Sequence, residues 1–267
     1  MSVKTHPSAI IHPSAQIDER AEIGPYAIIG EDVQIGAGTY VGPHSIIEFS
    51  LIGRNNHFTG HAFIGTPPQD YKYKNEKTRV EIGDNNIIRE GVSIHRGSPS
   101  TKVTIVGSGC MFMVNSHAGH DSRIGNNVIL TNSAGVGGHV EVEDGAIISG
   151  LCAIHQFVRI GRLAMIGGGA MVAQDIMPYC MAHGDRARLV GLNLVGMKRA
   201  EISRESIASI KRVYKTLFLE DLKLKEAILK LKLEKLSPEA SHMVEFIEKS
   251  KRGLARPRKK APVTFYE

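Results

Sequence analysis

Residues 123–172 read RIGNNVILTNSAGVGGHVEVEDGAIISGLCAIHQFVRIGRLAMIGGGAMV, and an aliphatic residue returns in this stretch at every sixth position. The same register begins at Ile82, and only Ser100 departs from the apolar rule. A period of six fits neither a continuous strand nor a helix, but it fits a coil whose flat sides each point one side chain inward. The sequence therefore predicts a parallel β-helix, in which three-sided coils of about 18 residues stack as a solenoid.

The repeats nearer the N-terminus are less regular. They run from Ile11 to Val41 in one register and, after a slip of one residue, from Ile46 to Ile64 in the next. Residues 66–79 lack the repeat and are rich in polar and aromatic side chains, so we expect a loop that leaves the solenoid there. A smaller protrusion is expected around Ser100. Loops on a rigid scaffold often carry binding groups.

The pattern becomes helical after the repeats end. Apolar residues three and four positions apart predict one helix containing Ile207 to Leu217 and another containing Leu224 to Leu231. The pair Ser237-Pro238 is typical of an N-cap followed by proline at the first helical position, which predicts a third helix. We therefore expect a β-helix over residues 1–185, and over 186–267 a crossing segment and a helical domain that caps the solenoid.

Composition limits the classes of function. The chain has 267 residues, no Trp, three Cys and a formal charge of +6. No apolar run is long enough to span a membrane, and the first residues show no signal segment, which predicts a cytoplasmic protein without membrane insertion. The odd number of scattered cysteines suits a reducing compartment. Basic side chains gather near the end of the chain, at Lys251, Arg252, Arg256, Arg258, Lys259 and Lys260. They fit an acidic protein, nucleic acid or a membrane surface as partner, or simply a solvated surface.

The densest polar cluster within the repeats is NSHAGHD at residues 115–121. Ala118 takes the inward position, so His120 and Asp121 are expected on the turn that follows it. Because residues about 18 apart stack on successive coils, His139 and then His155-Gln156 should lie close by, with His95 one or two coils away.

Such a row of histidines has three interpretations: a general base, a metal site, or turn histidines with ordinary hydrogen bonds. His120 directly followed by Asp121 favours the base, since a carboxylate can orient the imidazole and fix its tautomer. No acidic cluster or cysteine pair accompanies the histidines, so we expect no metal. The pair Gly137-Gly138 either offers a backbone N–H to a reacting carbonyl or is a simple corner.

Several motifs together resemble a known family. They are PQDYKY at 68–73, IHRG at 94–97, NSHAGHD at 115–121, GH at 138–139, HQF at 155–157, VAQD at 172–175, GLN at 191–193, GMKR at 196–199 and RGL at 252–254. Spread over essentially the whole chain, this set resembles the acyl-[acyl carrier protein]–UDP-N-acetylglucosamine O-acyltransferases, which begin lipid A synthesis. The resemblance implies a left-handed β-helix and a homotrimer with active sites between subunits. It implies acyl carrier protein and UDP-N-acetylglucosamine as partners rather than nucleic acid, and no cofactor beyond the phosphopantetheine thioester of the donor.

The resemblance also assigns roles to individual residues. It implies that His120 is the general base, that Asp121 supports its imidazole and that the Gly138 N–H stabilises the oxyanion. Gly168 matches the position that limits acyl-chain length, and a glycine there predicts a long chain. The residues implied around the sugar nucleotide are Gln69, Asp70, Lys72, His95, His117, His139, His155, Gln156, Asn193 and Arg199.

Two positions depart from the family pattern. Val195 and Ala200 stand where an acid and a second basic residue are expected near the nucleotide. The stretches around His120 and Arg199 also look like relatives that acylate a 3-amino sugar, so N-acylation is an alternative. A small-sugar acetyltransferase using acetyl-coenzyme A and a non-enzymatic β-helical scaffold are the others. The later N-acyltransferase of the same pathway has an extra N-terminal domain, and here the repeats begin by Ile11.

Overall fold

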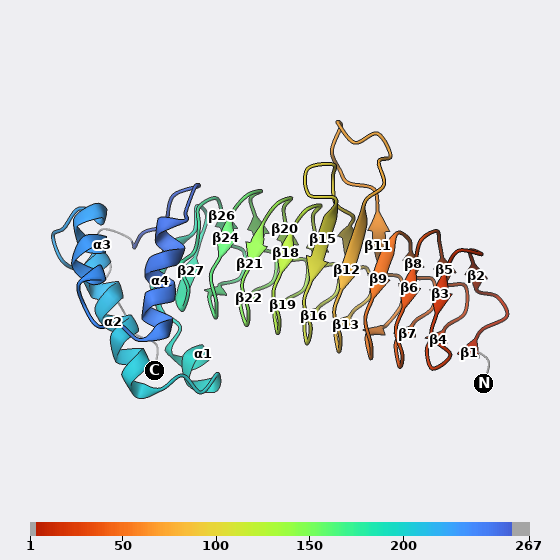
Figure 1. Ribbon diagram of the computed structural model, residues 1–267, viewed down its shortest axis with the longest axis horizontal. Coiled ribbons are helices and arrows are strands. Elements are labelled where there is room, and N and C mark those ends of the chain that lie inside the picture. Colours follow the sequence, from red (N-terminus) through yellow and green to blue (C-terminus); the bar gives the residue numbers. More distant parts are fainter. Residues whose placement is uncertain (1–3, 258–267) are drawn as a thin grey trace.

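The computed structural model describes residues 4–257, which form a long prism of short strands with helices packed at one end (Figure 1). Three parallel sheets run along the prism and make its sides. Sheet A contains β1 (Lys4–Thr5), β4 (Glu22–Ile23), β7 (Tyr40–Val41), β10 (His57–Phe58), β13 (Ile87–Ile88), β16 (Met111–Phe112), β19 (Ile129–Leu130), β22 (Ile147–Ile148), β25 (Met165–Ile166), β27 (Cys180–His183) and β28 (Arg188–Leu192). Sheet B contains β2 (Ile10–Ile11), β5 (Ile28–Ile29), β8 (Ile46–Ile47), β11 (Phe63–Thr66), β14 (Ser93–His95), β17 (His117–Ala118), β20 (Gly135–Val136), β23 (Ala153–Ile154) and β26 (Met171–Val172). Sheet C contains β3 (Gln16–Ile17), β6 (Gln34–Ile35), β9 (Ser50–Ile52), β12 (Arg79–Ile82), β15 (Val103–Val106), β18 (Arg123–Ile124), β21 (Glu141–Val142) and β24 (Arg159–Ile160).

The predicted inward column forms the core. Within the coils the second residue of most two-residue strands is buried, as for Ile29, Leu130 and Ile148, each fully covered. A second buried column, which the repeat analysis did not describe, lies two residues earlier and consists mainly of small side chains such as Ala27, Ala62 and Ala134. Large aliphatic residues fill the sides and small ones fill the corners, so the two columns together form the core of the coils.

One detail of the predicted register is wrong. The inward residue of β8 is Ile47, which is fully buried, whereas Ile46 faces outward. The slip therefore falls after Ile47, in a shortened turn where Phe49 has a positive φ of 44°. Ile11 is inward by register but 36% exposed. It lies in the first coil, whose open side is not covered by another coil.

The irregular features gather on the corner between sheets B and C. The shortened turn lies there, and so does the external loop, which occupies residues 67–78 between β11 and β12. The predicted smaller protrusion follows β14 on the same corner and ends at β15. Because this protrusion adds six residues, the hexad register resumes unchanged after it. Both loops project from the same edge of the prism (Figure 1).

The C-terminal region covers the end of the prism. An antiparallel hairpin, β27 with β28, extends sheet A and spans the predicted domain boundary at 185/186, which stays a prediction. It is followed by α1 (Leu194–Arg199), α2 (Arg204–Phe218), α3 (Leu224–Lys232) and α4 (Pro238–Glu248). The hairpin and α1 were not predicted. The three predicted helices are present, and the Ser237 hydroxyl caps α4 by accepting from the Ala240 N–H at 3.3 Å.

The segment after α4 returns to the last coil. Asp175 is buried, its side chain accepts from the Ser250 hydroxyl at 2.7 Å, and the Ala255 N–H donates to its carbonyl. The basic residues Arg258, Lys259 and Lys260 lie outside the described residues. None of the helices within residues 4–257 combines the length and apolarity that crossing a bilayer requires.

Candidate active site

His120 and Asp121 occupy the corner between β17 and β18, in the coil that follows the smaller loop along the chain. The Nδ1 of His120 lies 2.6 Å from Asp121 Oδ2, and the carboxylate has no exposed surface. An ionised carboxylate only accepts hydrogen bonds, so Nδ1 carries the proton and Nε2 keeps its lone pair. Within residues 4–257, His120 Nε2 has no hydrogen-bond partner. The arrangement leaves one imidazole nitrogen ready to accept a proton from a substrate.

The smaller loop holds the Asp121 carboxylate in place. Its Oδ1 accepts from the Ser98 N–H at 3.0 Å and from the Thr101 hydroxyl. Burial alone would raise the pKa of Asp121, but hydrogen bonds from His120, Thr101 and Ser98 outweigh it and hold this pKa well below its usual range. Sequence reasoning placed a protrusion here but gave Ser98 and Thr101 no role. Their one signal is the break in the repeat.

His139 completes the polar cluster. Its Nε2 lies 3.5 Å from Asp121 Oδ2, and its ring stacks on Phe157 one coil further along, with ring centres 4.6 Å apart. The ring of His120 meets that of His139 edge-on at 5.3 Å. The predicted proximity of His120 and His139 is therefore found in the structure.

Gly138 lies against the free side of the His120 ring. A Cβ atom at this position would stand 2.7 Å from His120 Nε2, closer than carbon and nitrogen approach without displacement. The Gly138 N–H donates to no acceptor within the described chain, while its carbonyl accepts from Phe157. Glycine here leaves room for a reacting group beside Nε2 and offers it a backbone donor.

An open cleft of about 390 Å³ surrounds these groups. The predicted residues that line it are Gln69, His95, His117, His120, Gly138 and Gln156. On the other side of Asp121 and His139 lies a second cavity of about 520 Å³, which basic side chains border at Arg123, Arg159, Lys249, Lys251 and Arg252. The C-terminal segment thus brings positive charge close to the imidazole pair.

Other predicted residues lie apart from the cleft. Asp70 and Lys72 are in the external loop, where Asp70 Oδ1 accepts from the Lys72 N–H at 3.0 Å. His155 is exposed, and its Nδ1 lies 3.0 Å from the Gln156 carbonyl. Gly168 is exposed on the corner between sheets A and B.

Asn193 and Arg199 line a third cavity, of about 460 Å³, on the outer face of sheet A with Met165 and Val195. Asn193 caps α1, because its Oδ1 accepts from the Gly196 N–H at 2.9 Å while its Nδ2 donates to the Leu163 carbonyl. These two residues are therefore not next to His120 within one chain.

His95 and His117 are held neutral beside the cleft. Burial lowers the pKa of His95 to about 4, and repulsion from His117 and His120 adds to this effect. Burial also lowers the pKa of His117, whose Nδ1 contacts the Ser93 hydroxyl at 2.8 Å. Neutral imidazoles can both donate and accept hydrogen bonds, which suits a row of sugar hydroxyls.

The low pKa of His95 predicts a pH-dependent stability. The unfolded chain binds a proton near pH 6.5 and the folded chain near pH 4, so stability is complete above the former value and falls as the pH drops toward the latter. The whole effect is at most about 3 kcal/mol, reduced by solvent screening near the open cleft. We expect the midpoint of urea unfolding to fall between about pH 7 and pH 4.5, and to fall less in His95→Asn. Equal slopes in the two proteins would contradict this.

The same cluster could also offer ligands to a metal ion. Ligand atoms of His120, Asp121 and His139 all lie within 4.8 Å of one another. The short bond between His120 and the carboxylate favours proton transfer instead. We expect dialysis against a chelator to leave the rate of the reaction at this site within about twofold, whereas the loss of a catalytic metal would raise its barrier by several kcal/mol. Recovery of a lost rate by added Zn²⁺ would establish a metal site.

Comparison with known proteins defines the class first. Residues 14–49 match the family described as bacterial transferase hexapeptide (six repeats). Together with the stacked coils, this match identifies the prism as a hexapeptide-repeat β-helix. Residues 175–255, which include the hairpin and the helices, match the family described as UDP N-acetylglucosamine O-acyltransferase, domain 2.

Individual relatives are more specific. An acyl-[acyl-carrier-protein]–UDP-N-acetylglucosamine O-acyltransferase from an Anaeromyxobacter species is 45% identical over 78% of this chain and 81% of its own. The enzyme of that name from Myxococcus xanthus is 48% identical over the same shares. The solved structure of LpxA from Acinetobacter baumannii has a TM-score of 0.91 and 41% identity, covering 95% of this chain and 100% of that one. The chain belongs to the acyl-[acyl-carrier-protein]–UDP-N-acetylglucosamine O-acyltransferase family and is an acyltransferase.

Proposed function

We propose that the protein transfers a 3-hydroxyacyl chain from acyl carrier protein to the 3-hydroxyl of UDP-N-acetylglucosamine, the first step of lipid A synthesis. The observation that carries the mechanism is the free Nε2 of His120, whose Nδ1 is bound to Asp121 at 2.6 Å and whose outer side faces Gly138. The relatives' names support the choice of substrates, and the geometry around His120 supports its proposed role as the base.

The chemical step follows from these positions. His120 Nε2 removes the proton of the sugar hydroxyl as its oxygen attacks the thioester carbonyl. The Gly138 N–H donates to the oxyanion of the tetrahedral intermediate. Its collapse breaks the C–S bond, and the departing thiolate takes the proton from the imidazolium. The Asp121 carboxylate stabilises that imidazolium without itself becoming protonated. No cofactor enters this step besides the donor's own thioester.

We propose that the acyl chain runs from the cleft across sheet B toward the corner at Gly168. The outward residues of β20 and β23 on this path are small, Gly135 and Ala153, whereas the next strand, β26, presents Met171. A Cβ at Gly168 would meet only the Gly150 carbonyl, at an ordinary 3.6 Å. A larger side chain therefore fits at residue 168 and would project over the surface.

Gly168→Met should shorten the preferred acyl chain. We expect transfer of long 3-hydroxyacyl chains to fall roughly 10- to 100-fold, since losing a few buried methylenes costs about 1–3 kcal/mol, while short chains keep their rate. A series of carrier proteins charged with different chains measures this. A variant that keeps the long-chain preference would show that Gly168 does not limit chain length.

We also propose a homotrimer with active sites between subunits. Outward residues of sheet A are apolar in successive coils, at Ile87, Met111, Ile129, Ile147, Met165 and Met181, which suits burial against another copy. The cavity with Asn193 and Arg199 lies on that face, and the His120 cleft lies on a different corner. If both sets bind one sugar nucleotide, they come from different subunits. Sedimentation analysis should then give a mass of three chains.

Further parts of the proposal rest on charge and on the family resemblance. The basic cavity at the C-terminal segment, with Lys249 and Lys251, suits the acidic acyl carrier protein better than a nucleic acid, because it is a local patch beside the candidate base. We also propose a cytoplasmic location, because the three cysteines are unpaired, which suits a reducing compartment. The coil is proposed to be left-handed, an exception to the usual crossover rule.

The deciding experiment offers two acceptors in parallel. Purified protein is given acyl carrier proteins charged with 3-hydroxyacyl chains, together with UDP-N-acetylglucosamine or its 3-amino analogue. Transfer to the hydroxyl sugar is expected. Transfer confined to the amino sugar would make the enzyme an N-acyltransferase, and transfer to neither would favour an acetyltransferase or a scaffold.

A further inference from the structure

A buried arginine joins the external loop to the coils beneath the cleft. The side chain of Arg96 is 7% exposed and lies in the turn after β14. Its Nη1 donates to the Gly65 carbonyl at 2.7 Å and to Glu48 Oε1 at 3.0 Å, and its Nε donates to the Tyr73 hydroxyl at 2.9 Å. The guanidinium also lies over the Phe49 ring, 4.4 Å from its centre. The Arg96 guanidinium thus contacts the external loop and the two preceding coils, which carry β8 and β11.

The position of the Gly65 carbonyl depends on an unusual backbone. Gly65 has a φ of 78°, and a Cβ there would stand 1.7 Å from the Glu48 carbonyl oxygen. Only glycine allows this approach. It lets the coil that carries β11 lie against the shortened turn, so that Gly65 and Glu48 converge on the same guanidinium nitrogen.

Tyr73 is the residue of the external loop that contacts Arg96. Besides accepting from Arg96, its hydroxyl donates to the Glu76 carbonyl at 2.7 Å. Its own N–H donates to the Asp70 carbonyl at 3.0 Å, which folds the tip of the loop back toward Gln69. Gln69 in turn lines the cleft together with His95, the residue before Arg96.

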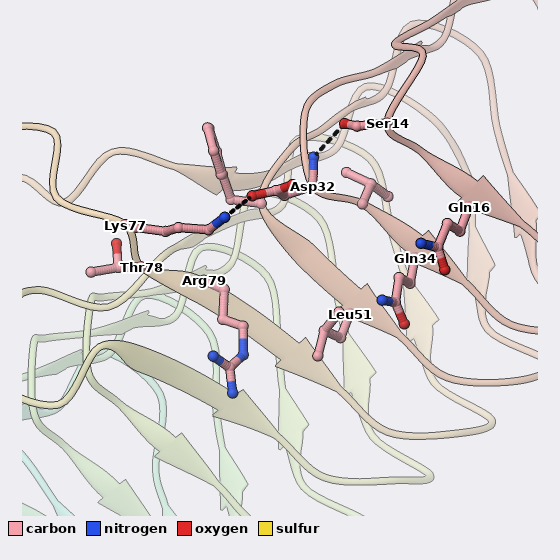
Figure 2. A pocket seen from close by; sticks show the side chains of 10 residues that line it. Ser14, Gln16, Asp32, Gln34, Leu51, Lys77, Thr78 and Arg79 are labelled. Carbon is pink, nitrogen blue, oxygen red and sulfur yellow. Dashed lines mark hydrogen bonds and ion pairs between the residues drawn. The ribbon is translucent and has the colours of Figure 1, made fainter.

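Another polar contact that ties the loop to a coil is exposed. Lys77 reaches Asp32 across the base of the loop at 2.8 Å, with side chains 85% and 38% exposed (Figure 2). Exposed ion pairs contribute little because water and salt screen them, whereas hydrogen bonds from a buried charge are considerably stronger. Of the two contacts, the one made by Arg96 should therefore decide where the loop sits.

We propose that Arg96 is a positioning residue, which through Tyr73 holds the external loop so that Gln69 stays at the cleft before the sugar nucleotide binds. The inference rests on the proposed function, since it takes the sugar nucleotide as the ligand of that loop. It predicts that loosening the contact weakens binding of the sugar nucleotide and leaves the acyl donor unaffected.

Three variants separate this role from a general structural one. Tyr73→Phe keeps the ring but removes the hydroxyl, and Arg96→Lys keeps the charge but removes the fork that reaches Gly65, Glu48 and Tyr73 together. Lys77→Met is the matched control, because it removes the exposed ion pair of the same loop. Thermal melting identifies any variant that fails to fold. If Arg96→Lys fails to fold, Tyr73→Phe alone tests the proposal.

Kinetics give the first readout. We expect Tyr73→Phe and Arg96→Lys to raise the KM for UDP-N-acetylglucosamine roughly 5- to 30-fold, with the KM for the charged carrier protein within about twofold, and Lys77→Met to change neither. The double variant should raise this KM no more than the single variant with the larger increase, because both changes break the same contact between Arg96 and Tyr73. Unchanged KM values in Tyr73→Phe, or equal increases for both substrates, would overturn the proposal.

Limited proteolysis gives a readout that does not need activity. Trypsin should cleave the loop after the exposed Lys72 and Lys74 several-fold faster in Tyr73→Phe than in wild type or Lys77→Met. If wild type transfers no acyl group, the proposed function fails, while faster cleavage would still establish the contact between Arg96 and the loop. Equal cleavage rates in wild type and Tyr73→Phe would overturn that contact itself.

Discussion

His120→Ala should lose most of the acyl-transfer rate while keeping its fold. A general base contributes roughly 10²- to 10⁴-fold, and Nε2 of His120 faces the cleft beside Gly138 with its other nitrogen held by Asp121. The His120 side chain lies at the edge of the cleft, and without it the buried Asp121 carboxylate still accepts from the Ser98 N–H and the Thr101 hydroxyl, so we expect the variant to stay folded. Single-turnover transfer from the charged carrier protein measures the chemical step directly.

A turn histidine elsewhere provides the control. His12 is exposed on a corner of the first coils and its Nδ1 contacts the Ser14 hydroxyl at 2.8 Å. His12→Ala should keep the rate within about twofold, because a surface hydrogen bond contributes little. A His120→Ala protein that is folded and fully active would remove His120 from the mechanism and leave a scaffold or another base to be considered.

The fold was largely predictable because one residue in every six must be apolar to be buried inside the coil. An inward aliphatic side chain at each flat side is visible in the sequence, and the structure places Leu130, Ile148 and their equivalents there. The error at β8 has a simple cause. Ile46 and Ile47 are equally apolar, so hydrophobicity could not choose between them, and the choice is made by the turn after them, where Phe49 takes a positive φ.

The C-terminal hairpin and α1 were missed for another reason. Their residues carry no strong period, and contacts with more distant residues help to hold them, such as the pairing of β27 with β25 and the hydrogen bond from Asn193 to the Leu163 carbonyl. Tertiary contacts of this kind can determine the structure of a short segment whose own sequence has only a weak preference.

The site was predictable in part. The stacking of coils brings His120 and His139 together, as their separation of about one coil indicated. The contacts of Ser98 and Thr101 with Asp121 could not be predicted, since they depend on how a loop folds back over more than one coil. Nor could sequence place Asn193 and Arg199 on a different face from the cleft, because a resemblance names residues without locating them in one subunit.

Asp121→Asn should be nearly as damaging as the loss of His120. The carboxylate accepts from His120 Nδ1, from the Ser98 N–H and from the Thr101 hydroxyl, which orients it fully. An amide of the same shape can keep the contacts to the loop on its oxygen, but it then turns its NH₂ toward His120. The imidazole must accept through Nδ1 and carry its proton on Nε2, where it cannot act as a base. We expect a loss of roughly 10²- to 10⁴-fold in kcat, and no larger than the loss in His120→Ala.

A control variant and a double variant distinguish this effect on the tautomer of His120 from a loss of stability. Asp144 is an exposed corner carboxylate that accepts from the Asn126 N–H at 2.7 Å, and Asp144→Asn should stay within about twofold of wild type. Because Asp121 acts through His120, the double variant should be no slower than His120→Ala alone. Losses that multiply would mean that Asp121 contacts the substrate independently. A silent Asp121→Asn would mean that the tautomer of His120 is set by something other than this carboxylate.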